Sequence, residues 1–158
     1  MAPSGSIVIR RARAADLADL TALLQILFGI EEDFSFDEAR QRQGLMLMLE
    51  NEQGVVLAAE NSGKVIGMCT GQLLISTAEG GPAVLVEDVV VLPAWQDRGV
   101  GRLLMRSIAE WAAGKKATRL QLLADRNNKA ALTFYDKIGW QMTDLICLRK
   151  TVDSKRKS

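Results

Sequence analysis

A glycine-containing turn joins an apolar, strand-like run to a helix-like run, and it constrains the fold of this chain more than any other segment. The turn covers residues 96–101 (QDRGVG), after the apolar run 84–92 and before the helix-like run 102–113. Glycine lets the backbone approach a ligand closely, and the first N–H groups of a helix have no partner within it. Those N–H groups, the helix dipole, Arg98 and Arg102 together favour an anion such as pyrophosphate.

Two common phosphate-binding motifs do not match this turn. A Walker loop needs Gly-Lys-Ser/Thr, whereas Arg102 and Leu103 follow Gly101. A dinucleotide-binding fingerprint needs a third glycine three residues further on, where Leu104 stands. A tight strand-to-helix connection that binds no ligand stays open as the alternative.

The size and charge of the chain favour a single globular domain. Its 158 residues are enough for one domain with a substantial core, and 48% hydrophobic with 25% charged residues is ordinary for a soluble protein. The formal net charge of +1, with one basic run at 155–157, does not indicate nucleic acid as a partner. We expect a cytoplasmic protein with no membrane partner, because no leader-like or membrane-spanning apolar run is present. Residues 1–5 and 152–158 are expected to be flexible tails.

The chain contains no histidine, which limits its possible chemistry. A Ser-His-Asp triad, a histidine general base and the usual zinc ligand sets are excluded, so no metal is expected. Cys69 and Cys147 are far apart and lie in apolar, strand-like contexts, so we expect both to be core thiols. Catalysis would have to use Glu, Asp, Tyr, Lys, Cys or the backbone.

The hydrophobic pattern predicts an α/β chain with a mixed sheet and helices on its faces. A capping-box pattern of Ser35 and Glu38 opens the second helix. Strands 84–92 and 119–124, joined by a helix, are expected to form a right-handed parallel crossover. The expected strands are 7–10, 55–60, 64–76, 84–92, 119–124 and 140–151, the last as a strand or hairpin, and the expected helices are 15–30, 35–50, 102–113 and 128–138.

Over nearly its whole length the chain resembles the GNAT superfamily of N-acetyltransferases. The acyl-CoA motif of that family, Gln/Arg-x-x-Gly-x-Gly/Ala after a central strand, is matched by Gln96, Gly99 and Gly101. A second block of the family is matched by Asn128, Ala131, Tyr135, Gly139 and Trp140. The resemblance implies a GNAT-like fold of α+β type, with a central, mostly antiparallel sheet, one parallel splayed strand pair and helices on both faces.

The resemblance also implies that acetyl-CoA is the cosubstrate. Its pantetheine arm is expected along the backbone of Val89, Val90 and Val91, with Asn128 and Ala131 on the same side. Asn128 fits the role of a helix cap equally well. The residues expected around the pyrophosphate are Gln96, Asp97, Arg98, Gly99, Val100, Gly101 and Arg102.

Transfer of an acetyl group to an amine requires a proton donor for the leaving thiolate and a route for the amine proton. By resemblance, Tyr135 is the candidate acid, since a phenol with a pKa of about 10 can protonate a thiolate of about 8.5. A tyrosine that only packs is the alternative. Glu87 is the candidate base, because the pattern 86–91 (VEDVVV) is similar to the polyamine-acetylating branch. A purely structural carboxylate is its alternative. Side chains alternate along a strand, so only one of Glu87 and Asp88 is expected to line the groove.

Residues 28–36 (FGIEEDFSF) combine acidic and aromatic side chains near the expected acceptor site. Glu31, Glu32 and Asp33 are candidate substrate-binding residues that would attract a small cationic molecule such as a polyamine or an aminoglycoside, or a lysine-rich peptide. Alternatively, Asp33 and Asp37 only favour the start of the second helix, and the glutamates are solvated.

The leading hypothesis is an acetyl-CoA-dependent N-acetyltransferase that acts on a primary amine of a small cationic molecule, by direct attack in a ternary complex. Two alternatives are an acetyltransferase for protein lysines or N-termini and a non-catalytic acyl-CoA sensor. By resemblance a homodimer is possible, although no interface is recognisable in the sequence.

Overall fold

The computed structural model describes residues 5–30 and 34–152 of the chain. It divides into two compact units, Met1–Leu122 and Leu123–Ser158. Within the described ranges, no helix has the length and apolar character needed to cross a membrane, and no three His, Cys, Asp or Glu side chains gather as metal ligands would.

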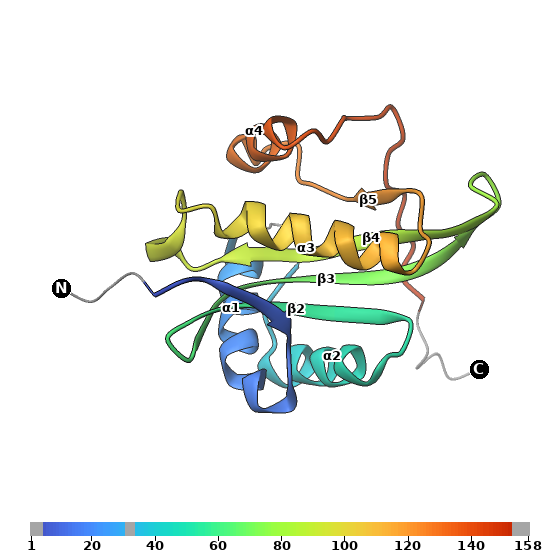
Figure 1. The fold of residues 1–158 in the computed structure, drawn as a ribbon. Coiled ribbons are helices and arrows are strands. Elements are labelled where there is room, and N and C mark those ends of the chain that lie inside the picture. Colours follow the sequence, from blue (N-terminus) through green and yellow to red (C-terminus); the bar gives the residue numbers. More distant parts are fainter. Residues whose placement is uncertain (1–4, 31–33, 153–158) are drawn as a thin grey trace, which may run out of the picture. The chain divides into compact units, whose positions relative to one another are not determined.

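The first unit contains a five-stranded mixed sheet in the order β1-β2-β3-β4-β5 (Figure 1). The first three pairings are antiparallel, whereas β4 and β5 are parallel. Both the mostly antiparallel sheet and its one parallel pair are therefore confirmed. The strands are β1 Val8–Arg11, β2 Gly54–Asn61, β3 Lys64–Ser76, β4 Gly81–Val91 and β5 Leu120–Leu122.

Helices cover both faces of this sheet. Met68 of β3 belongs to a buried cluster with Leu20 and Leu23, whereas the Sγ atom of the next residue, Cys69, lies 4.0 Å from the carbonyl oxygen of Leu104. Because neighbouring strand residues point to opposite faces, the helices that carry these leucines lie on opposite sides. The helices are η1 Ala14–Asp16, α1 Leu17–Ile30, α2 Glu38–Glu50, η2 Pro93–Trp95, α3 Val100–Gly114 and, in the second unit, α4 Lys129–Lys137.

The helix α3 packs closely on β3 because two strand positions lack side chains. A Cβ atom at Gly71 would lie 2.7 Å from Cδ1 of Ile108, and one at Gly67 would lie 3.2 Å from Cγ1 of Val100. Val100 and Ile108 are both buried. The fit of α3 against the sheet fixes the position of its first turn, which begins at Val100.

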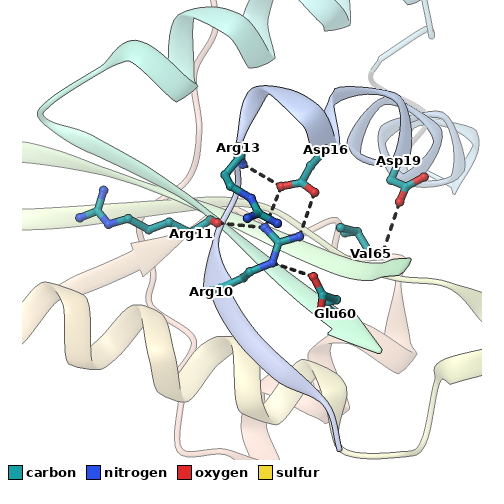
Figure 2. Close-up of polar contacts among 7 residues, drawn as sticks. All are labelled: Arg10, Arg11, Arg13, Asp16, Asp19, Glu60 and Val65. Carbon is teal, nitrogen blue, oxygen red and sulfur yellow. Dashed lines mark hydrogen bonds and ion pairs between the residues drawn. The ribbon is translucent and has the colours of Figure 1, made fainter. Parts of the chain in front are cut away.

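Partly buried ion pairs connect the N-terminal strand β1 to the neighbouring strand β2 and to the short helix η1 (Figure 2). The Arg10 guanidinium donates to both carboxylate oxygens of Asp16, at 2.7 and 2.9 Å, and to Glu60 at 2.9 Å. The Asp16 carboxylate also accepts from the backbone N–H of Arg13 at 2.7 Å. These bonds from Arg10, and secondarily that of Arg13, hold the pKa of Asp16 below its ordinary value despite burial.

The second helix is capped two residues later than expected, so the prediction of a Ser35 cap was wrong. The N-cap is Asp37, whose carboxylate accepts from the N–H of Arg40 at 3.3 Å. Its own N–H donates to Oε1 of Gln41 at 2.6 Å. Asp37 thus caps the first turn, which agrees with the alternative interpretation for this residue alone.

The prediction of a final strand at 140–151 was also wrong, because the structure has no strand in this segment, all of which it describes. Its apolar residues are largely exposed, including Leu145 at 88% and Leu148 at 87%. An alternating hydrophobic pattern forms a strand only where a neighbouring strand supplies hydrogen bonds and the apolar side chains can be buried. Cys147 is exposed as well, so it is not a core thiol, whereas burial of Cys69 is confirmed.

Candidate functional site

The strand β4 has an edge that is only partly paired. It pairs with β5 through Val84, Leu85 and Val86, and with β3 along most of its length. Beyond Val86, no strand among the described residues adds to the β5 side, so the parallel pairing ends there and the expected splay stays a prediction. The segment 89–91, expected to contact pantetheine through Val89, Val90 and Val91, lies in this stretch. The side-chain amide of Gln96 donates to the carbonyl oxygen of Val91 at 3.3 Å and marks its end.

The turn after β4 has the backbone conformation of an anion-binding loop. Asp97 and Gly99 both have positive φ, 61° and 82°, and Gly99 is the N-cap of α3. A Cβ atom at Gly99 would meet nothing within 4 Å, so the space beside it is open. The first bond of the helix runs from the N–H of Leu103 to the carbonyl oxygen of Gly99, at 3.1 Å. The N–H groups before Leu103, those of Val100, Gly101 and Arg102, are the ones a helix leaves without acceptors of its own.

Two arginines of the turn are exposed. The Arg98 guanidinium lies over the ring of Trp95, with 5.1 Å between its central carbon and the ring centroid. Arg102 stands in the first turn of α3. Their charges add to the helix dipole, so the turn can bind a doubly charged group such as pyrophosphate. An extended, amide-bearing arm could then add to the edge of β4 at 89–91, as strands add to sheets.

A β-bulge interrupts β4 at the candidate base. Met68 pairs with Val90 and Thr70 pairs with Glu87, so two residues of β4 lie opposite Cys69 alone. One of them, Asp88, has a φ of 52°, and the hydroxyl of Thr70 donates to the carbonyl oxygen of Glu87 at 3.1 Å. The bulge breaks the alternation of side chains.

As a result, Glu87 and Asp88 line the same cleft, and the expectation that only one of them would do so was wrong. Glu87 is exposed and Asp88 is half-buried. The cleft measures about 300 Å³ and lies within the first unit, between the first two helices and strands β3 and β4. Its lining residues are Leu24, Phe28, Arg40, Gln41, Gly44, Leu45, Met48, Thr70, Gln72, Glu87 and Asp88.

Cys69 lies opposite the bulge and is fully buried. Burial, with a smaller contribution from the negative charge of Asp88, raises the pKa of its thiol to about 12. The thiol therefore stays protonated at neutral pH and is a poor nucleophile.

The second unit carries the remaining candidate residues. Asn128 is the N-cap of α4, and its Oδ1 accepts from the N–H of Ala131 at 3.1 Å, which confirms the capping role; a role of either residue in cofactor binding stays a prediction. Tyr135 is half-buried, with its ring centroid 5.3 Å from that of Phe134 and 5.9 Å from that of Trp140. Tyr135 and Glu87, the acid and base candidates, belong to different units.

Sequence reasoning placed substrate binding on Glu31, Glu32 and Asp33, which lie outside the described residues. It missed several polar residues of the cleft, namely Arg40, Gln41, Thr70 and Gln72. Gly44 could have indicated the cleft from sequence. Glycine is unfavourable inside a helix, so its presence in a helical run suggests a reason other than helix stability. The four polar residues come together only when α2 folds over the sheet. The periodicity of the sequence gives no information about that packing.

The fold and the turn define a class of protein: an α+β domain in which a parallel strand pair lies beside an anion-binding helix start. Residues 18–140 match the Acetyltransferase (GNAT) family. The chain therefore belongs to the GNAT family and is an N-acetyltransferase by class.

Individual relatives agree with this assignment. The Uncharacterized N-acetyltransferase YhfO of Bacillus subtilis is 27% identical over 137 residues, which cover 84% of this chain and 89% of that protein. The glucosamine 6-phosphate N-acetyltransferase of Trypanosoma brucei brucei is 26% identical, covering 85% of this chain and 91% of its own. A structure of the aminoglycoside N-acetyltransferase AAC(6')-Iy in complex with CoA superposes with a TM-score of 0.81 at 18% identity, over 96% of this chain and 99% of that one, and so shows the shared fold.

Proposed function

We propose that the protein transfers the acetyl group of acetyl-CoA to a primary amine of a small molecule by direct attack in a ternary complex. The observation that carries the proposal is the edge of β4 at 89–91, beyond the pairing with β5, which leads into the turn with the open, left-handed Gly99. The pantetheine amides would pair with the backbone of Val89 and Val91 while the pyrophosphate binds at the start of α3. Relatives named for CoA binding and amine acetylation favour the same ligand.

The acceptor would bind in the cleft beside Glu87. Its neutral amine nitrogen attacks the thioester carbon, a C–N bond forms, and the C–S bond breaks. Glu87, directly or through an ordered water, receives the amine proton, and a backbone N–H of the bulged strand near Val89 donates to the oxyanion. By its match to the second sequence block of the family, Tyr135 is the proposed donor of a proton to the departing CoA thiolate.

The burial and protonation of the Cys69 thiol, which lies opposite the bulge, favour direct attack over an acetyl-cysteine intermediate at this residue. Cys69 is fully buried, and the pKa of its thiol is raised to about 12. A protonated thiol without access to solvent cannot take the acetyl group from acetyl-CoA at a useful rate. This argues against Cys69 as an acetyl carrier and supports attack with both substrates bound at once.

The experiment is an assay with acetyl-CoA and a panel of primary amines and peptides, in which free thiol is followed and the product mass is measured. We expect thiol release to depend on a small amine and the product to gain one acetyl group. Acetylation of peptides only would favour a protein acetyltransferase instead. Binding of acetyl-CoA without turnover on any acceptor would favour the sensor hypothesis.

A further inference from the structure

The cleft beside Glu87 is lined by charges of both signs that come from different elements. The helix α2 contributes Arg40, and β4 contributes Glu87 and Asp88. A ligand that carries only positive charge would suit the two carboxylates and be repelled by the guanidinium. The mixed charge of the cleft therefore favours an amine that also carries a negative group.

The Arg40 guanidinium has no acidic partner within the part of the chain that the structure describes. Its backbone N–H donates to Asp37, but its guanidinium makes no hydrogen bond or ion pair with any described residue. Arg10, in contrast, is bonded to two carboxylates. An exposed arginine with free donors, placed at the wall of a cleft, is available to a planar acidic group of a ligand.

Gly44 gives an independent indication that a ligand lies along this helix. It stands one turn after Arg40 in the interior of α2 and lines the same cleft. Glycine at such a position costs about 1 kcal/mol relative to alanine. Packing within the protein does not require it, because a Cβ atom there would meet nothing within 4 Å. The missing side chain leaves room beside Arg40 for a bound molecule.

We propose that the acceptor carries an acidic group, a carboxylate or a phosphate, in addition to its primary amine. Arg40 binds the acidic group beside Gly44, and the amine binds near the carboxylate of Glu87. This inference rests on the proposed acetyl transfer and names the acceptor class for the same cleft. A volume of about 300 Å³ is at the lower end for small-molecule sites, so the acceptor is small.

The test compares acceptors that differ in the acidic group alone. Glucosamine 6-phosphate is paired with glucosamine, and leucine is paired with leucinamide, while spermidine represents a polycation. Values of kcat/KM are measured from thiol release after subtraction of the rate without acceptor. We expect the acid-bearing member of at least one pair to exceed both its partner and spermidine by about tenfold or more. The pair that shows the preference distinguishes phosphate from carboxylate.

Variants of α2 then connect this preference to one side chain. Arg40→Gln should raise KM for the preferred acid-bearing acceptor by about tenfold, with kcat and the values for its uncharged partner nearly retained. Arg40→Glu should move the preference towards spermidine. Arg42→Gln is the matched control, because Arg42 lies on the same helix but lines a separate depression.

Two failures are distinguishable. Turnover without any preference for an acidic group, or an equal loss on both members of a pair in Arg40→Gln, would overturn this inference and leave the acetyl transfer standing. Absence of acceptor-dependent thiol release with every amine, while acetyl-CoA still binds, would overturn the proposed function and the acceptor class with it.

Discussion

The hydroxyl of Thr70 donates to the carbonyl oxygen of Glu87 at 3.1 Å, at the point where β4 carries one residue more than β3. Thr70 is 2% exposed, so this bond is made away from water. It fixes the backbone of the residue proposed as the base.

Replacing Thr70 by valine removes the bond and keeps the shape. We expect Thr70→Val to lower the free energy of unfolding by about 1 kcal/mol and to reduce kcat about tenfold, because Glu87 is less firmly placed. Thr21→Val is the control, since the hydroxyl of Thr21 donates to the carbonyl oxygen of Leu17 at 2.7 Å outside the cleft. Equal kcat in both variants would contradict a positioning role for Thr70.

Glu87 and Asp88 line one cleft, so their roles must be separated by substitution. We expect Glu87→Gln to lower kcat/KM by about a hundredfold and to alter the pH–rate profile. Asp88→Asn should have a smaller effect, because asparagine tolerates the φ of 52° and preserves the bulge. An unchanged pH–rate profile in Glu87→Gln would remove Glu87 as the base.

Tyr135→Phe removes only a hydroxyl and keeps the ring contacts with Phe134 and Trp140. We expect kcat to fall by about a hundredfold, while the affinity for acetyl-CoA and the melting temperature stay close to those of the wild type. Steady-state kinetics and calorimetry give the three quantities. If the rate is the same at every pH, Tyr135 is a packing residue.

Gly99 and Gly80 form a matched pair for testing the anion-binding turn. Both have positive φ, 82° and 70°, and a Cβ atom at either would meet nothing within 4 Å. Alanine should therefore cost each about 1 kcal/mol of stability through backbone strain. We expect only Gly99→Ala to weaken CoA binding as well, by about tenfold or more, in isothermal titration. A similar loss in Gly80→Ala would show that stability alone is responsible.

The bond between Arg10 and Asp16 gives stability that depends on pH. The folded-state pKa of Asp16 is lowered by Arg10, so its contribution is present above the unfolded pKa of about 4 and is lost as the pH falls through the folded value. Asp16→Asn should cost about 2 kcal/mol at pH 7, and the difference from wild type should shrink below about pH 4. Urea unfolding at several pH values measures this, with the exposed Glu110→Gln as control. A difference independent of pH would exclude the charge as its cause.

Much of the sheet could be predicted from local pattern. The apolar run before the turn, and the helix after it, placed β4 and α3 because their periodicities differ and Gly99 marks the boundary. The parallel pairing with β5 was predicted from the strand-helix-strand order, because a helix between two strands typically joins parallel neighbours.

The cleft could not be predicted in the same way. The bulge at Asp88 depends on the register between β3 and β4, a relation between residues far apart in sequence. Arg40 meets Glu87 at one cleft only because α2 folds over the sheet. In the segment after Trp140 the local pattern was misleading. The pattern is strand-like, but no described strand pairs with this segment.

The absence of a side chain at Gly71 has a consequence for ligand binding. Ile108 occupies the space that a methyl group at position 71 would need, and Ile108 lies two turns after the start of α3. A larger residue there would push the helix outward and carry its first N–H groups away from the edge of β4. If CoA binds as proposed, its affinity would thus depend partly on a glycine buried in the core, away from the turn itself.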